Sequence, residues 1–188
     1  ENFEKNWDHG IFHHQWSNNQ LKQWTKAHTR YLRKVYLDQN KRRIVVRNPA
    51  YTSRILLLRS LWPDAQFIHI YRNPYEVFPS MRNYFQKLFP ALALQEYAHI
   101  DIDRVILSTY QKLMQAVIRD QQQLSSNEII EISYEDLRQS PISTMGEVYE
   151  KLELPGFETS GRYFEKYLDG IRGYQRNKYH RDPSEVEL

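Results

Sequence analysis

A short apolar segment that runs directly into a well-specified helix start constrains the fold of this chain more than any other feature. Phe67–Tyr71 has the composition of a strand, Asn73 is a favourable N-cap residue, and Pro74 suits the first position of a helix. Glu76 stands at the spacing of a capping box. Such a junction places unsatisfied backbone N–H groups and the positive end of a helix dipole beside the end of a strand.

Two side chains at this junction suit a phosphate group. Arg72 can bind a phosphate through two parallel hydrogen bonds, and Ser80 supplies a hydroxyl about two helical turns later. An ordinary strand–helix turn with a solvent-facing arginine explains the same residues equally well. The choice between the two interpretations depends on a second motif.

The second motif is another short apolar strand, predicted at 128–133, which continues into the sequence Tyr-Glu-Asp-Leu from Tyr134. A proline, a helix predicted over 143–153 and the sequence Leu-Pro-Gly-Phe at 154–157 follow. Together with Arg-Asn-Pro at 72–74 and the serine eight residues after that arginine, this order resembles the PAPS-dependent sulfotransferase family. The resemblance extends from about residue 43 to residue 179 and depends on the order and spacing of the motifs.

The resemblance implies roles for individual residues. In the family the arginine and the serine bind the 3′-phosphate of the nucleotide, which maps onto Arg72 and Ser80, and the tyrosine contacts the adenine, which maps onto Tyr134. A lysine that contacts the 5′-phosphate corresponds to Arg47. The implied co-substrate is PAPS or its product PAP, with no metal, and the acceptor is an unknown hydroxyl or amine.

A late basic segment also resembles the family, in which a glycine-containing stretch closes over the nucleotide. Residues 172–179 combine three cations with two tyrosines and an asparagine. Tyr174 and Asn177 are the candidate nucleotide contacts there, and a basic solvated tail is the alternative.

The family's glycine-rich phosphate loop has no counterpart in this chain, because Gly10 is the only glycine before Gly146. Either the chain is the carboxyl part of a longer sulfotransferase, or it is a non-catalytic 3′-phosphonucleotide-binding or interaction protein derived from that fold. A nucleotide kinase is disfavoured, since no Gly-x-x-x-x-Gly-Lys-Ser/Thr loop is present. The chain by itself is expected to be incomplete for catalysis.

No catalytic residue is assigned from the sequence. Arg47 is a candidate through its positive charge, and His13 and His14 are candidate bases. Arg47 keeps the positive charge of the family's lysine but not its compact ammonium, and Pro49 stands where some members carry a catalytic histidine. A helix-capping or surface pair is the ordinary explanation of His13 and His14. A zinc site including His9 lacks a fourth ligand at suitable spacing, so no metal is expected.

The expected fold class is α/β, with a three-layer, P-loop-NTPase-like parallel sheet flanked by helices and lacking the first strand and phosphate loop. Arg47, Arg72 and Tyr134 follow predicted strands, so their side chains are expected to meet at one edge of the sheet. His69 is expected to be a hydrogen-bonded core histidine. The remaining predicted elements are helices over 17–38, 51–62, 101–124 and 158–169 and strands over 44–46 and 67–71.

Length and composition predict one domain over 1–188, with a helical part at 1–42, a nucleotide-binding core at 43–179 and a polar tail at 180–188. The absence of cysteine excludes disulfides and thiolate nucleophiles. No segment has the length of a membrane span or the pattern of a signal peptide, so a cytoplasmic protein is expected.

Nucleic acid is not an expected partner at a net charge of +3. A basic cluster is interpreted as a solvated helix face and loop, although it could favour an anionic ligand: Arg30, Arg33, Lys34, Lys41, Arg42, Arg43 and Arg47.

Overall fold

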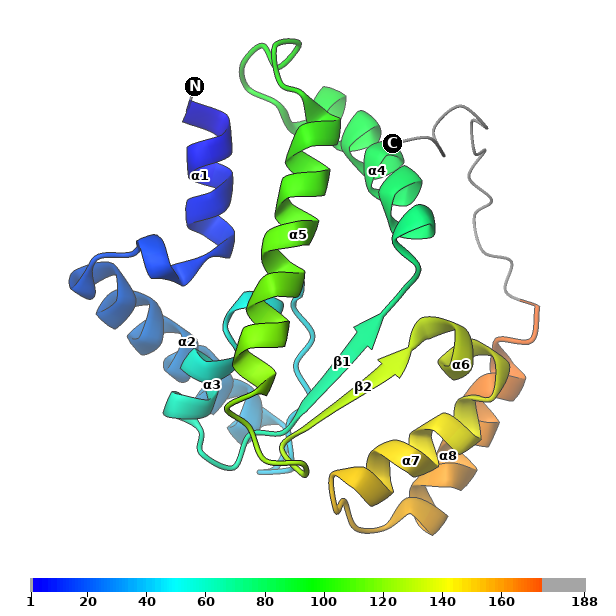
Figure 1. The fold of residues 1–188 in the computed structure, drawn as a ribbon. Helices are drawn as coiled ribbons and strands as arrows, with labels where there is room; N and C mark the ends of the chain where they lie inside the picture. Colours follow the sequence, from blue (N-terminus) through cyan, green and yellow to red (C-terminus); the bar gives the residue numbers. More distant parts are fainter. Residues whose placement is uncertain (1, 174–188) are drawn as a thin grey trace. The chain divides into compact units, whose positions relative to one another are not determined.

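The computed structural model describes residues 2–173, which form a helix-rich α/β structure with one small parallel sheet (Figure 1). Two compact units can be distinguished. The first comprises the described residues up to Ala65 together with Thr109–Gln122, and the second comprises Gln66–Ser108 and the described residues from Gln123. The single-domain organisation of 1–188 stays a prediction.

The first unit is entirely helical apart from its connecting segments. Its elements are α1 (Asn2–Ile11), the 3-10 helix η1 (His13–Gln15), α2 (Asn18–Asp38), the 3-10 helix η2 (Pro49–Ser53), α3 (Ile55–Leu61) and the later part of α5 (Ile102–Gln121). A reciprocal capping box begins α2, because Ser17 Oγ accepts from the Gln20 backbone N–H at 3.3 Å and Gln20 Oε1 accepts from the Ser17 N–H at 2.8 Å. The helix predicted over 17–38 is confirmed.

The strand predicted at 44–46 is wrong. Val45 is 91% exposed, and the segment pairs with no other strand in the part of the chain that the structure describes. A run of β-branched residues favours extended backbone, but a strand also needs a hydrogen-bonded neighbour. The helix expected over 51–62 is likewise divided into η2 and α3, with Arg54 between them.

Arg54 is a buried cation at the centre of the first unit. Its side chain is 5% exposed, and its Nη2 and Nε donate to the Gly10 and Ile11 carbonyls at 2.5 and 3.2 Å. The guanidinium carbon also lies 4.7 Å from the ring centroid of Trp16 and 5.2 Å from that of Trp24. One side chain therefore satisfies carbonyls at the C-terminal end of α1, which the helix itself leaves without donors.

The second unit contains the sheet, whose strands β1 (Phe67–Tyr71) and β2 (Ile129–Ser133) pair in parallel (Figure 1). Both strands lie where the sequence predicts them. The helices of this unit are α4 (Pro74–Leu92), the first part of α5, α6 (Tyr134–Gln139), α7 (Pro141–Lys151) and α8 (Phe157–Gly170). The short helix α6 is not anticipated by the sequence as a separate element.

Helix α7 covers β2 with apolar side chains. Ile132 of the strand and Val148 and Leu152 of the helix are buried in one cluster. His69 belongs to the opposite set of alternating positions, where its Nδ1 lies 2.8 Å from Glu131 Oε1 of the directly paired residue on β2. The contact confirms that His69 is hydrogen-bonded, but its prediction as a core residue is wrong, because the side chain is only partly buried and pairs with an exposed glutamate.

Replacing Arg54 by alanine tests its structural role. We expect Arg54→Ala to lower the free energy of unfolding by about 3 kcal/mol, because the Gly10 and Ile11 carbonyls lose hydrogen bonds, the two tryptophan rings lose their cation, and a buried side chain is removed. Chemical denaturation measures this loss. Arg33→Ala, at an exposed arginine of α2, is the matched control and should change stability by less than about 0.5 kcal/mol. Equal losses in the two variants would contradict the role of Arg54.

Candidate functional site

At the junction after β1 the helix begins as predicted, but Glu76 has a different partner from the one that the sequence predicts. Asn73 caps α4 by accepting from the Tyr75 backbone N–H at 3.0 Å, and Pro74 occupies the first helical position. The expected capping box would have directed Glu76 back toward Asn73. The Asn73 side chain accepts from the Tyr75 N–H rather than from the Glu76 N–H, so the reciprocal capping box does not form. The Glu76 carboxylate binds Arg72, one helical turn away, because opposite charges at this spacing meet on the helix surface.

Arg72 is held in a defined orientation by two neighbours. Its Nε and Nη2 donate to Glu76 Oε2 at 3.1 and 2.5 Å, and its guanidinium carbon lies 4.9 Å from the ring centroid of Tyr134. Both members of the ion pair are partly buried. Glu76 occupies donors on one side of the guanidinium, so the Nη1 side is the part of Arg72 suited to a phosphate oxygen.

Tyr134 reaches Arg72 because of the register of the sheet. Tyr71 and Ser133 are direct partners at the carboxyl ends of the two strands, so the next residue of each strand leaves the sheet at the same edge. Ser133 also caps α6, accepting from the Asp136 N–H at 2.9 Å and donating to the Asp136 carboxylate at 2.8 Å. The structure thus brings Arg72 and Tyr134 together, as the sequence predicts.

Ser80 lies two turns into α4 and is partly buried; its hydroxyl forms no hydrogen bond with any residue that the structure describes. The helix that carries it is fixed nearby by a two-point ion pair. Arg82 donates from Nε and Nη2 to Asp103 at the start of α5, at 2.7 and 2.5 Å, and Phe85 of α4 is fully buried. The hydroxyl is therefore carried on a rigid helix with its hydrogen-bonding capacity available.

Three other predicted nucleotide contacts are not brought to this site by the described structure. Arg47 is exposed in the connecting segment between α2 and η2 of the first unit, so its convergence with Arg72 and Tyr134 stays a prediction. Tyr174 and Asn177 lie outside the described residues.

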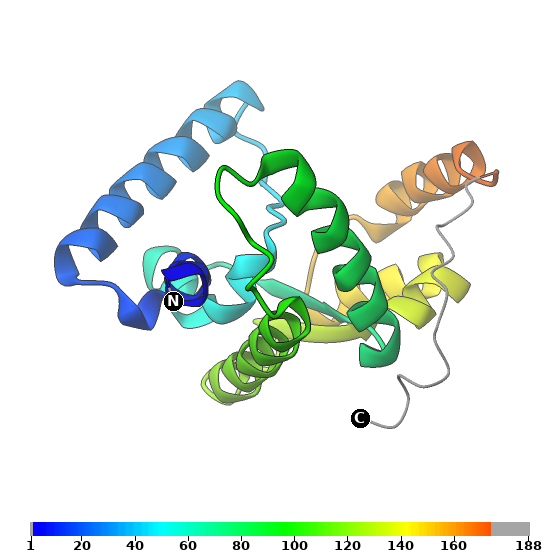
Figure 2. The same ribbon diagram turned by 90° about the horizontal axis from the view of Figure 1, so that it is seen from above.

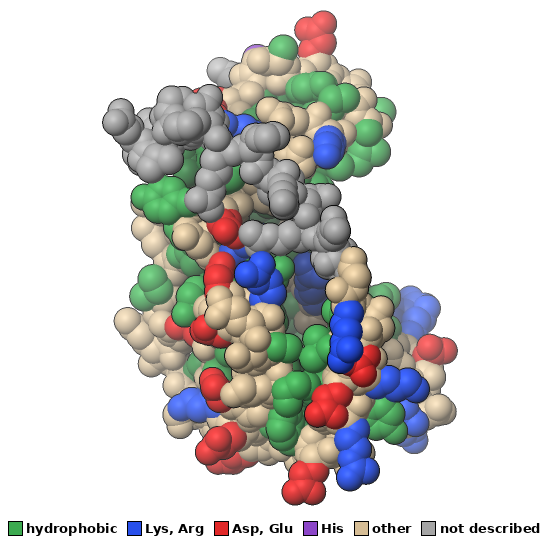
Figure 3. Space-filling view, turned by 90° about the vertical axis from the view of Figure 1, so that its right-hand side faces the viewer, with side chains coloured by type: hydrophobic (Ala, Val, Ile, Leu, Met, Phe, Trp, Pro, Cys, Tyr) green, Lys and Arg blue, Asp and Glu red, His purple; other side chains and the backbone are tan. Residues whose placement is uncertain are grey.

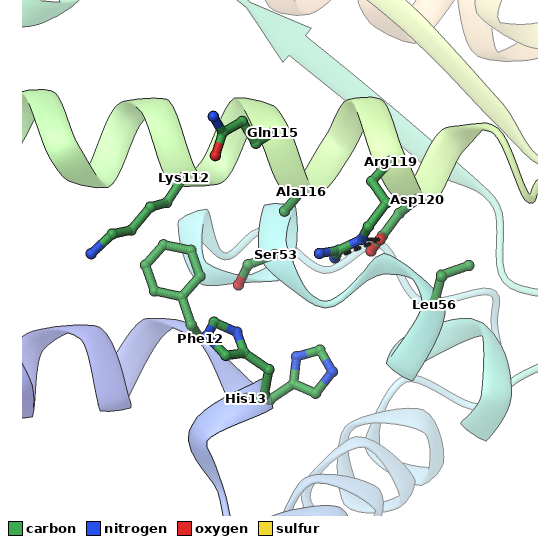
Figure 4. A pocket seen from close by; sticks show the side chains of 10 residues that line it. Phe12, His13, Ser53, Leu56, Lys112, Gln115, Ala116, Arg119 and Asp120 are labelled. Carbon is green, nitrogen blue, oxygen red and sulfur yellow. Dashed lines mark hydrogen bonds and ion pairs between the residues drawn. The ribbon is translucent and has the colours of Figure 1, made fainter.

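The first unit contains a cavity of about 390 Å³ beside the two adjacent histidines. Figure 4 shows Ala116 and Arg119 projecting from α5 toward the segment that carries Phe12 and His13. Phe12 is buried and His14 is exposed. The cavity lies within the usual size range of small-molecule sites.

Among the side chains that line this cavity, His13 has a pKa that differs from its ordinary value. Its Nδ1 is buried and has no hydrogen-bond partner among the described residues. Burial, followed by the nearby Arg54 guanidinium and His14, lowers the pKa of His13, while the Asp120 carboxylate acts in the opposite direction. A neutral imidazole at neutral pH can accept a proton, which is what a general base requires.

Asp120 is an acidic residue that the sequence analysis did not single out. It is 1% exposed and accepts from the Arg119 Nε at 2.8 Å. Nothing in its local sequence distinguishes it from a surface residue near the end of an amphipathic helix. The Arg72–Glu76 pair was also missed, although its i,i+4 spacing is visible in the sequence.

The described residues show no metal site, no broad charged surface on the face that carries α7 and α8, and no membrane-spanning helix. No group of three His, Asp or Glu side chains there is arranged to hold a metal ion. Figure 3 shows acidic and basic side chains interspersed over the face that carries α7 and α8, without a broad region of one sign among the described side chains. None of the described helices combines the length and apolar character needed to cross a membrane.

Comparison with known proteins gives consistent matches. A family model described as "Sulfotransferase family" matches residues 2–159. Proteins named omega-hydroxy-beta-dihydromenaquinone-9 sulfotransferase Stf3, from Mycobacterium bovis and Mycobacterium tuberculosis, are each 29% identical to the chain over 160 residues, or 85% of it. The match covers 41% of each relative, so the chain spans about two fifths of the length of these curated relatives. No solved structure matches the chain significantly.

Two partly buried histidines of the first unit predict a pH-dependent stability. Burial, with a smaller contribution from Arg54, also lowers the pKa of His28, so His13 and His28 both bind protons less readily in the folded state. Their contribution to stability is fully present above the ordinary histidine pKa of 6.5 and is lost as the pH falls through the lowered folded values. We expect denaturation at pH 5 and pH 7.5 to show this loss.

A double variant, His13→Gln with His28→Gln, should lose less stability between these two pH values than the parent chain. His99→Gln, at an exposed histidine of the second unit, is the matched control and should leave the pH dependence unchanged. The same pH dependence in all three proteins would show that other groups cause it.

Proposed function

The chain belongs to the sulfotransferase family, and on this basis we propose that it binds PAPS or PAP at the carboxyl end of the β1–β2 sheet. The observation that carries the proposal is the position of the Arg72 guanidinium 4.9 Å from the Tyr134 ring, at the N-terminus of α4. A cation and an aromatic face beside the positive end of a helix dipole suit a phosphorylated adenosine.

We assign each group of the nucleotide to particular residues. The 3′-phosphate is bound by Arg72 and Ser80, and the adenine by Tyr134. Arg47 meets the 5′-phosphate, and Tyr174 and Asn177 belong to a segment that closes over the nucleotide. These assignments need the first unit to complete a three-layer, P-loop-NTPase-like arrangement with the sheet.

The proposed reaction is transfer of the sulfuryl group from PAPS to an acceptor oxygen or nitrogen. The acceptor attacks sulfur and loses its proton to a base, the sulfur–oxygen bond to the 5′-phosphate breaks, and the new charge stays on the phosphate of PAP. The relatives' name describes a hydroxylated dihydromenaquinone, which favours a hydroxyl acceptor. His13 is the candidate base, because its imidazole is neutral and borders a cavity.

A second candidate function is binding of a 3′-phosphonucleotide without catalysis. The position of the glycines favours it, since no glycine lies between Gly10 and Gly146 to build a phosphate loop. A glycine-rich loop encoded upstream of Glu1 would favour the enzyme. Both functions use the same Arg72, Ser80 and Tyr134 site.

Binding of PAP and of adenosine 5′-monophosphate distinguishes the proposed 3′-phosphate site from a general adenosine site. PAP at 100 times its dissociation constant should add about 2.7 kcal/mol, or roughly 5–10 °C in melting temperature for a chain of this size. Adenosine 5′-monophosphate, which lacks the 3′-phosphate, should stabilise the chain much less. Thermal denaturation measures both shifts.

Arg72→Ala should remove the difference between the two nucleotides, because it deletes the charge-assisted contact to the 3′-phosphate. Arg162→Ala, at an exposed arginine of α8 in the same unit, is the matched control and should keep the difference. Equal shifts from PAP and adenosine 5′-monophosphate in the parent chain would refute the assignment.

Turnover of PAPS by the 188-residue chain is expected to be undetectable with hydroxyl or amine acceptors. Backbone N–H donors around a developing oxyanion are each worth about 10²–10³ in rate, and the sequence offers no glycine-rich loop to supply them. Release of PAP in the presence of acceptor measures transfer. A rate on the order of 1 s⁻¹ or more would show that the cradle for the 5′-phosphosulfate lies within this chain.

A further inference from the structure

Helix α2 carries a row of cations without any acidic residue to balance it. Lys22, Lys26, Arg30 and Lys34 follow one another at i,i+4 spacing, and Arg33 lies beside the row. All five side chains are exposed, and Asp38 is the first acidic residue of the helix. Figure 2 shows α2 as one straight, unbroken helix, so these charges line a single face.

This arrangement opposes helix formation. Like charges at i,i+4 destabilise a helix, and the row contains three such pairs in succession. None of the five cations forms an ion pair with a residue that the structure describes. A binding partner that supplies negative charge would relieve this repulsion.

An apolar groove lies alongside the cations. A hollow of about 790 Å³ is lined by these five residues and by leucines of α2 and α3: Leu21, Leu37, Leu57 and Leu61. Leu37 is 63% exposed, which leaves a large apolar side chain in water at the end of the basic row. Cations and leucines therefore share one surface of the first unit.

We propose that α2 and this groove form a docking surface for a bilayer that contains anionic phospholipid. Lipid head groups provide the negative charge that the row lacks, and the boundary of the acyl chains accepts the exposed leucines. Nucleic acid would satisfy the cations but not the leucines, because its interfaces are polar and highly charged. This surface acts independently of the proposed nucleotide site.

Sedimentation with vesicles tests the proposal on the whole 188-residue chain. The chain should bind vesicles of phosphatidylcholine mixed with an equal amount of phosphatidylglycerol, and it should bind pure phosphatidylcholine vesicles far less. Binding should weaken between about 0.1 M and about 1 M salt, because the Debye length falls from about 10 Å to about 3 Å.

Reversing the charge of cations on α2 tests whether this helix is the part of the chain that binds the vesicles. The double variant Lys26→Glu with Arg30→Glu should reduce binding by about 30-fold or more, since each cation near an anionic membrane contributes roughly 1 kcal/mol. Arg162→Glu with Lys166→Glu is the matched control, because these exposed residues of α8 have the same i,i+4 spacing and give the same net charge. Similar losses in the two variants would overturn the location.

The leucine contact distinguishes a bilayer from any other polyanion. Leu37→Ser should weaken vesicle binding about tenfold through lost apolar burial, and it should leave binding to single-stranded RNA or an acidic peptide unchanged. Circular dichroism and PAP binding of each variant show whether it is folded. Tight RNA binding by a chain that does not sediment with anionic vesicles would refute the proposal.

Discussion

The parallel pairing of β1 with β2 is the constraint on which the candidate nucleotide site depends. The register sets Tyr71 opposite Ser133, so Arg72 and Tyr134 emerge side by side although about sixty residues separate them. Two strands alone are marginally stable in water. The sheet is supported by the cluster of Ile132, Val148 and Leu152, so the geometry of a polar site rests on apolar packing between β2 and α7.

The first unit depends on a different interaction, the burial of one guanidinium. Arg54 has carbonyl and aromatic partners rather than a carboxylate, and burial lowers its pKa. The same positive charge contributes to the lowered pKa values of His13 and His28. A residue that joins α1 to the aromatic cluster therefore adds to the effect of burial in lowering the pKa of nearby imidazoles, which links the stability of this unit to the chemistry of its cavity.

Arginines in this chain have different uses according to their neighbours. Arg72 is oriented by Glu76 and Tyr134, which reduces the entropy that it loses when it binds a phosphate. The cations of α2 have no ion-pair partners among the described residues and form an extended row. An oriented guanidinium suits one ligand group in one position, whereas an unpaired row suits a diffuse negative surface.

Local patterns in the sequence determined α2, α4, α5, α7 and α8 and the two strands of the sheet. They also determined the meeting of Arg72 with Tyr134, because parallel strands of known order bring their ends together. Tertiary structure decided what local propensity cannot. Residues 44–46 favour extended backbone but have no strand partner in the described structure. The Asn73 side chain caps the Tyr75 N–H while Glu76 forms an ion pair with Arg72, and Asp120 is buried beside a cavity. These outcomes depend on neighbours that are distant in sequence or on competition between partners. A single local pattern contains neither kind of information.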